Sequence, residues 1–295
     1  MKLVSAVIIT HNRKQLVMRA VESVLEQTYS NVECIVVDDA STDGTNELFA
    51  DNNEVQYIYI PQSDSRGGNH ARNVGIAAAK GEYVAFLDDD DYWLPTKIEK
   101  QVSLIKEKNC EVVYCGMRPE FITPDGNVRF EEWLPIEGGE GDLRGEILTK
   151  IFTVTSALLI KKSILLQIGG FDEKLRYWQE YELLIRLAQE TLIYAVQECL
   201  FVYRIDECDN QRLTNKYMSW KFSVHSVHKK HRRLYKRLPI VKQIDAIRMY
   251  HSEAYNRAKK NNLKTYCIKH KLVCYLLKRV RYIISVVQPE NHEKH

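Results

Sequence analysis

Apolar and polar positions alternate between strand-like and helix-like spacing over the first hundred residues of the chain. After the first apolar run, Leu16, Ala20 and Val24 recur at the spacing of one helix face. A second helical stretch opens at Gly67-Gly68 and ends at Gly81. This alternation predicts an α/β fold with a mostly parallel sheet covered by helices. The apolar runs expected to form strands are residues 3–9, 32–37, 55–60 and 83–87.

The pattern is mixed between residues 110 and 205, so the sheet is expected to contain antiparallel strands as well. A hairpin is predicted over residues 121–130, because Pro124-Asp125-Gly126-Asn127 supplies turn residues at its middle. A helix is predicted over residues 177–188. The remaining predicted strands are residues 112–116, 156–160, 192–196 and 201–205.

Charge divides the chain into an acidic body and a basic tail. Residues 216–295 hold 20 Lys and Arg against 4 Asp and Glu, whereas residues 1–215 hold 22 against 35. We therefore expect an α/β domain over residues 1–215 and a basic helical region over residues 216–295.

One long amphipathic helix is predicted in the tail, over residues 263–287. Leu272, Leu276, Val280 and Ile283 share its apolar face with Val273, Leu277, Ile284 and Val287. One interpretation is contact with an anionic membrane surface, and the other is packing on the body or on a second subunit, as in a homodimer. Nucleic-acid binding is disfavoured, because the tail shows no recognised binding motif.

Cysteine usage and hydropathy bear on the compartment. The seven cysteines are an odd, scattered set without a CxxC pair, which is typical of a reducing compartment and argues against a structural zinc site. No apolar stretch reaches the length of a membrane span, and the start of the chain does not resemble a signal peptide. We expect a cytoplasmic protein, and the membrane interpretation of the tail would place it on the inner face of the membrane.

Four adjacent aspartates, Asp88, Asp89, Asp90 and Asp91, follow the apolar run of residues 83–87 directly. Neighbouring carboxylates repel one another, and a hard divalent cation relieves that repulsion while sharing its coordination with phosphate. The alternative interpretation is a solvated acidic turn. In open α/β sheets ligands bind beyond the carboxyl ends of the strands, which favours the metal-phosphate site.

Two other predicted strands also end in polar residues. Thr10-His11-Asn12-Arg13 follows the first strand and Asp38-Asp39 ends the second, while Arg66 and Arg72 flank the start of the helix after Gly68. Carboxylates, a guanidinium and a metal together are typical of nucleotide binding. No GxGxxG follows the first strand and no GxxxxGK[ST] occurs, which weakens the dinucleotide and P-loop alternatives.

These motifs resemble the family 2 glycosyltransferases, inverting enzymes of the GT-A fold. The resemblance covers roughly residues 1–205 and implies a nucleotide-diphosphate-sugar donor, with a UDP-sugar expected, and Mn²⁺ or Mg²⁺ as cofactor. The motifs that carry it are Thr10-His11-Asn12-Arg13, Val36-Val37-Asp38-Asp39-Ala40-Ser41-Thr42-Asp43-Gly44-Thr45, Gly68-Asn69-His70-Ala71-Arg72-Asn73-Val74-Gly75, Phe86-Leu87-Asp88-Asp89-Asp90-Asp91-Tyr92-Trp93-Leu94-Pro95, Gly169-Gly170-Phe171-Asp172-Glu173 and Gln179-Glu180-Tyr181-Glu182-Leu183.

The resemblance also implies roles for individual residues. Asp88 and Asp90 match the first and last acids of the family's Asp-X-Asp element, and both are expected at the metal, with Asp90 as its direct ligand. Asp91 is expected to be structural, and Asp88 or Asp89 to lie nearer the ribose and sugar. The expected nucleotide-sugar-binding residues are Thr10, Asn12, Arg13, Asp39, Arg72, Asp88 and Asp89.

Two glutamates are candidates for the catalytic base that inverting transfer needs. Spacing places Glu180 on the leucine stripe of its predicted helix, and Glu182 in an exposed pair with Arg186 four residues on. The family commonly has Glu-Asp here with the second acid as base, so the resemblance assigns that role to Glu180. Beside it, Trp178 is predicted either to stack on the acceptor sugar or to pack in the core.

The sequence thus predicts a GT-A-type α/β domain, with a mostly parallel mixed sheet flanked by helices and a C-terminal helical extension. Its expected activity is metal-dependent, inverting hexosyl or N-acetylhexosaminyl transfer to a saccharide or lipid-linked acceptor in polysaccharide biosynthesis. Two alternatives are a non-catalytic nucleotide-sugar-binding protein and a metal-dependent nucleotidyltransferase, which would release pyrophosphate.

Overall fold

The structure, a computed structural model, describes residues 1–208 and 217–287 and divides them into two compact units. The first unit contains residues 1–143 and 152–208, and the second contains residues 144–151 and 217–287. The predicted domain boundary between residues 215 and 216 lies outside the described residues. The second unit also takes in residues 144–151, which the charge pattern had left within the body.

The first unit is built on one mixed sheet, which forms nine strands within the described residues. Its parallel half has the order β3-β2-β1-β4, and the alternation of strands and helices predicts such parallel pairing. The chain therefore moves outward from β1 to β3 and returns to the other side of β1 for β4. The parallel strands are β1 (Val4–Thr10), β2 (Val32–Asp39), β3 (Val55–Ile60) and β4 (Tyr83–Asp88).

The second half of the sheet mixes directions. β8 pairs antiparallel with both β4 and β6, and β6 runs parallel to β9. The predicted hairpin is confirmed as the pairing of β6 with β7, whereas the two strands predicted over residues 192–205 form one continuous strand, β9. The strands of this half are β5 (Tyr92–Trp93), β6 (Val112–Ile122), β7 (Val128–Phe130), β8 (Leu159–Lys161) and β9 (Ile193–Asp206).

Helices α1 and α2 pack against the parallel strands. Val17, Ala20 and Val24 of α1 are buried, as their spacing predicts. Gly75 lets α2 approach β1 closely, because a Cβ there would lie 2.3 Å from a methyl group of Val7. The helices of this unit are α1 (Lys14–Leu25), α2 (Gly68–Ala78), α3 (Lys97–Lys108), α4 (Lys162–Gln167) and α5 (Gln179–Glu190), with 3₁₀ turns η1 (Thr45–Phe49) and η3 (Thr155–Ala157).

The second unit is helical, and its two longest helices, α8 and α9, lie side by side. The predicted tail helix is confirmed as α9, but most of its predicted apolar face is exposed: Leu272 is 55% exposed and Ile283 58%. Within the described residues, no helix combines the length and apolarity needed to cross a membrane. The elements of this unit are η2 (Glu146–Leu148), α6 (Tyr217–Lys230), α7 (Arg232–Arg237), α8 (Ile240–Lys260) and α9 (Lys264–Val287).

Candidate nucleotide and metal site

The polar ends of three parallel strands meet at one edge of the sheet. Thr10 is in register with Asp38 of β2, and its neighbour Ile9 is in register with Asp88 of β4. The strand order reverses between β1 and β4, and such a switch point is where open α/β sheets bind ligands. The sequence prediction that these residues share an edge is therefore confirmed.

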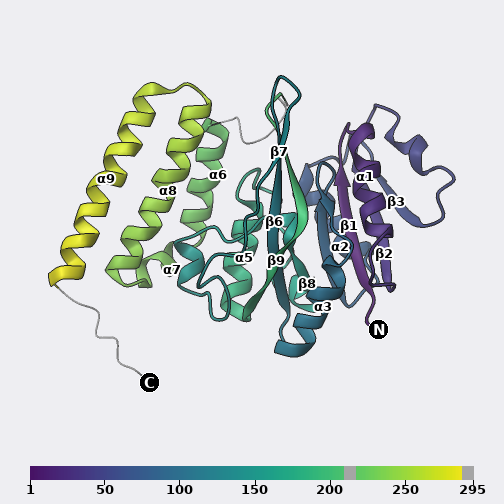
Figure 1. Ribbon diagram of the computed structural model, residues 1–295, viewed down its shortest axis with the longest axis horizontal. Helices are drawn as coiled ribbons and strands as arrows, with labels where there is room; N and C mark the ends of the chain where they lie inside the picture. Colours follow the sequence, from purple (N-terminus) through teal and green to yellow (C-terminus); the bar gives the residue numbers. More distant parts are fainter. Residues whose placement is uncertain (209–216, 288–295) are drawn as a thin grey trace. The chain divides into compact units, whose positions relative to one another are not determined.

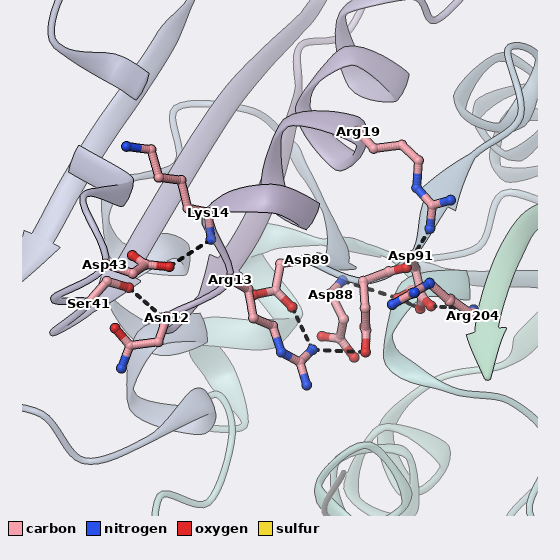
Figure 2. A network of polar contacts seen from close by, with 12 residues as sticks. Asn12, Arg13, Lys14, Arg19, Ser41, Asp43, Asp88, Asp89, Asp91 and Arg204 are labelled. Carbon is pink, nitrogen blue, oxygen red and sulfur yellow. Dashed lines mark hydrogen bonds and ion pairs between the residues drawn. The ribbon is translucent and has the colours of Figure 1, made fainter. Parts of the chain in front are cut away.

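Two arginines divide the acidic run between them. Arg13, in the loop after β1, lies 2.9 Å from a carboxylate oxygen of Asp89 and 2.9 Å from one of Asp90 (Figure 2). Arg72 of α2 lies 2.6 Å from Asp88. Each arginine thus neutralises part of the repulsion among adjacent carboxylates.

Asp91 is held inside the protein. It is 1% exposed, and its carboxylate accepts hydrogen bonds from the Ser156 hydroxyl at 2.6 Å and from the Arg204 backbone N–H at 3.1 Å. Burial and the charges of Asp90 and Asp88 raise its pKa well above the usual range. These contacts support the predicted structural role of Asp91.

Asp89 is also buried, yet it faces Arg13. Burial raises its pKa to about 7, and the nearby Arg13 charge opposes that rise. Burial alone would lower the pKa of Arg13, but the carboxylates of Asp89 and Asp90 hold that pKa above its ordinary value. Three of the four acids therefore share these two arginines, while Asp91 is held by the Ser156 hydroxyl and the Arg204 backbone.

Asp39 presents an unsatisfied oxygen beside this cluster. Its Oδ2 accepts the Gly67 backbone N–H at 2.9 Å, whereas its buried Oδ1 has no hydrogen-bond partner among the described residues. The buried Thr10 hydroxyl lies beside the Asp89 carboxylate, where it opposes the rise that burial causes in the pKa of Asp89. Buried polar groups are normally satisfied, so Oδ1 of Asp39 marks a place for a ligand donor. Asp38 is instead occupied by Tyr57 and the Ser41 backbone.

Asn12 connects the loops that follow β1 and β2. Its backbone N–H donates to the Ser41 hydroxyl at 2.7 Å (Figure 2). Its side-chain oxygen accepts the Thr42 N–H at 2.7 Å. Asn12, Ala40 and Trp178 all have positive φ angles, of 52°, 63° and 57°. Such backbone strain is often found at functional sites. The sequence shows no sign of it at Ala40 or Trp178, since neither residue type favours that conformation.

Arg72 links the acidic loop to the start of α5. Besides Asp88, its guanidinium donates to Gln179 Oε1 at 3.0 Å and to Asn69 Oδ1 at 3.3 Å, and it is 4% exposed. Gln179 precedes Glu180, so this contact brings the candidate base toward the edge that carries Asp88. Sequence reasoning assigned no role to Gln179 or Asn69, because their contacts with Arg72 are made only in the fold.

The predicted exposed pair of Glu182 and Arg186 is wrong in one respect, because Glu182 is fully buried. Arg186 holds it with three hydrogen bonds of 2.7 to 3.1 Å. Helix α5 buries seven residues spread around most of its circumference, so leucine spacing did not reveal which glutamate faces inward. Glu180, in the first turn, is partly exposed. The ion pair with Arg186 fixes Glu182 in the core, whereas Glu180 keeps part of its surface accessible beside Gln179.

Trp178, the residue before α5, is 4% exposed and packs edge-on against Tyr181 with ring centroids 4.8 Å apart. This placement matches the packing interpretation of the ring. Contact with an acceptor would require the ring to become exposed.

A divalent metal fits this edge only if a ligand completes its coordination. Among the described residues, no group of three or more His, Cys, Asp or Glu side chains forms a metal site. Asp88 and Asp90 nevertheless keep 32% and 19% of their side chains exposed, and carboxylate oxygens are the ligands of Mg²⁺ and Mn²⁺. Two carboxylates with phosphate oxygens from a bound nucleotide would complete such a shell.

Sequence comparison finds glycosyltransferases. A UDP-Glc:alpha-D-GlcNAc-diphosphoundecaprenol beta-1,3-glucosyltransferase, WfaP of Escherichia coli, is 42% identical over 106 residues, which are 36% of this chain and 42% of WfaP. The chain spans 63% to 64% of uncharacterised glycosyltransferases from Haemophilus influenzae and two Rickettsia species, and so less than two thirds of these first relatives.

Solved structures share the fold. S. aureus TarS 1–349 in complex with UDP-GlcNAc superposes with a TM-score of 0.59 at 15% identity, over 94% of this chain and 92% of that one. The mannosyltransferase PcManGT from Pyrobaculum calidifontis, in complex with GDP-Man and Mn²⁺, gives 0.58 at 17% identity, over 98% and 88%. These confirm the GT-A-like fold. The model of Glycosyl transferase family 2 matches residues 5–167, more than half of the chain, and the protein therefore belongs to that family.

Proposed function

We propose that the protein is an inverting glycosyltransferase that moves a hexosyl or N-acetylhexosaminyl group from a nucleotide-diphosphate sugar, with a UDP-sugar expected, to a hydroxyl of an acceptor. The observation that carries this proposal is the Arg72 contact. It joins Asp88 of the acidic edge to Gln179, next to Glu180, and so brings a metal-binding edge and a candidate base into one site. Family membership supports the same activity.

Each residue then has a defined task. Oδ1 of Asp39 and the Thr10 hydroxyl hydrogen-bond to polar groups of the nucleotide's base. Arg13 keeps Asp89 and Asp90 in place. Asp90 and Asp88 would hold Mn²⁺ or Mg²⁺, which, when bound, stabilises the negative charge on the departing diphosphate. Glu180 accepts the proton of the acceptor hydroxyl as that oxygen bonds to C1 and the bond from C1 to the phosphate oxygen breaks.

The acceptor is proposed to be a saccharide or a lipid-linked saccharide of polysaccharide biosynthesis. The name of the relative WfaP specifies a sugar on a diphosphate-linked lipid as its acceptor. A relative from Bacillus subtilis, TuaG, is named for teichuronic acid biosynthesis, which supports a polysaccharide setting.

The test separates chemistry from donor binding. Glu180→Gln should lower transfer by at least about 100-fold, because it removes the proton acceptor, and should spare UDP affinity. Glu190→Gln, exposed at the far end of the same helix, is the matched control and should retain activity. Near-normal turnover in Glu180→Gln would refute the assignment.

Metal binding has its own measurement. Asp90→Ala should lose the Mn²⁺-dependent part of UDP binding in a calorimetric titration, since it removes the proposed metal ligand. Unchanged affinity in the presence of Mn²⁺ would contradict that role. Release of pyrophosphate would instead indicate a nucleotidyltransferase, and nucleotide-sugar binding without turnover would indicate a non-catalytic binding protein.

We also propose that α9 contacts an anionic membrane surface, where lipid-linked acceptors reside. Helix α9 carries six Lys and Arg and no acid, and seven of its large apolar side chains are exposed. Such a helix lies in the interface between headgroups and acyl chains. Replacing Lys271 and Lys278 by Glu should reduce pelleting with phosphatidylserine vesicles, whereas a second copy bound at this face would instead show as a change in sedimentation coefficient.

A further inference from the structure

The hairpin of β6 and β7 extends past the acidic edge. Val113 of β6 and Ala85 of β4 pair with the same residue of β8, so the two lie level in the sheet. β4 ends three residues later at Asp88, whereas β6 continues to Ile122. β6 therefore runs roughly 15 to 20 Å beyond the strand end that carries the aspartates. Figure 1 shows the hairpin, labelled β7, projecting from the sheet.

The two faces of this hairpin carry similar groups with different partners. Phe130 is in register with Glu120, and the Arg118 guanidinium lies 4.9 Å from the centre of its ring. On the opposite face, Arg129 lies 4.0 Å from the centre of the Phe121 ring. The chain thus offers two arginine–phenylalanine pairs, one on each face of the same ribbon.

The face of Phe130 is connected to the acidic edge through Arg19 of α1. Arg19 of α1 donates to the backbone oxygen of Asp90 at 3.0 Å and lies 3.4 Å from the Glu120 carboxylate. Its guanidinium also covers the Tyr92 ring at 4.4 Å. Burial and the charge of Glu120 raise the pKa of Tyr92, whereas the charges of Arg19 and Arg118 oppose the rise. Glu120, Arg19 and Arg118 therefore all lie close enough to Tyr92 to affect its charge.

Charge compensation also differs between the two faces. Glu120 pairs with Arg19, and Glu131 pairs with Arg129. Arg118 is exposed and makes no ion pair with a carboxylate in the part of the chain that the structure describes. Phe130 beside it is 44% exposed. An uncompensated planar cation held on an aromatic ring is suited to a phosphate next to an apolar ring face.

We propose that Arg118 and Phe130 bind the acceptor, and that this acceptor is a sugar bearing a phosphate ester, with the phosphate on Arg118 and the sugar ring on Phe130. The inference rests on the proposed glycosyltransferase function and adds the chemical class of the acceptor. Arg118 is a specificity-determining residue that touches the acceptor away from the reacting atoms.

The experiment compares two acceptors that differ only in the phosphate. A panel of hexoses and N-acetylhexosamines is offered as short-chain alkyl glycosyl phosphates and as the corresponding neutral alkyl glycosides. Arg118→Gln should raise the KM for the phosphate-bearing acceptor about tenfold or more, because a charge-assisted contact is lost. The KM for the neutral glycoside, the donor KM and donor hydrolysis should change less than about twofold.

Arg129→Gln is the matched control, because it removes the same cation from the other face, and it should leave both KM values unchanged. Equal effects of the two substitutions, equal effects on the two acceptors, or a wild type that does not prefer the phosphate-bearing acceptor would each overturn the inference. Phe130→Ala should raise the KM for both acceptors. Unchanged KM values would show that Phe130 does not contact the acceptor. Absence of donor hydrolysis and of transfer in the wild type would instead refute the proposed function itself.

Discussion

The two units keep ionisable side chains away from water by different means. In the first, the fully buried acid Glu182 is held by Arg186. In the second, His270 is 3% exposed and hydrogen-bonds to the Tyr217 hydroxyl and to a second histidine, each at 2.8 Å. An ion pair keeps its charges at neutral pH, whereas a buried imidazole stays neutral. The stability of the first unit therefore depends on keeping both members of its ion pairs, and the stability of the second depends on pH.

Breaking an ion pair in the first unit should give the largest effect. Arg186→Met leaves the fully buried Glu182 without its guanidinium and should lower the free energy of unfolding by about 3 kcal/mol. Urea unfolding measures the change. The double variant Glu182→Gln/Arg186→Met should recover part of the loss, because no buried charge is then left behind. A single variant as stable as the wild type would show that the pair does not determine stability here.

The same contrast explains what the sequence could predict. Apolar runs gave the parallel strands and placed Thr10, Asp39 and Asp88 at one edge, because period and strand ends are local properties. The contacts of Arg13 with Asp89, 76 residues away, arise only when the loops meet. Arg19 falls among the polar positions of α1, so spacing gave it no role.

Burial of polar residues was harder to predict than burial of apolar ones. Leucine spacing placed Glu180 inward and Glu182 outward, yet Glu182 is the buried one, because Arg186 accompanies it into the core. The exposed face of α9 is the converse case, since an apolar stripe predicts a contact without saying whether protein or lipid supplies it. Hydrophobic spacing therefore predicts the layers of strands and helices well, while ion pairs form only when the folded chain brings their partners together.

Acid should weaken the second unit next. Burial lowers the pKa of His228 and His270 from 6.5 to about 4. Because the folded-state pKa is below the unfolded one, the unfolded chain binds more protons between pH 6.5 and 4, and stability falls as pH drops through that window. We expect a loss on the order of 2 to 3 kcal/mol between pH 7 and 5.

Hydrogen exchange corrected for intrinsic rates locates this loss. Amides of α6, α8 and α9 should lose protection at pH 5 relative to pH 7, and those of β1, β2 and β4 should lose less. His228→Phe should remove part of the pH dependence. Equal loss of protection in both units would contradict the contrast between them.

Lys97 is an exception within the first unit, and it should give the smallest effect. It is fully buried, yet the described residues provide it with the Gln101 side chain at 2.8 Å and the Trp93 ring at 4.2 Å rather than a carboxylate. Burial lowers its pKa from 10.5 to about 8. The folded-state pKa is again below the unfolded one, so stability should rise with pH between about 8 and 10.5.

Lys97→Met removes the buried cation and keeps a similar volume, so it should raise the free energy of unfolding at pH 7 by about 1 to 2 kcal/mol. Its advantage over the wild type should shrink toward pH 10, where the wild-type lysine is neutral in the fold. Gln101→Leu, which removes the hydrogen-bond acceptor and leaves the cation, should lower stability at pH 7. If the gain from Lys97→Met were the same at both pH values, packing rather than charge would account for it. Lys97 would then not count as a buried cation that lowers the stability of this unit.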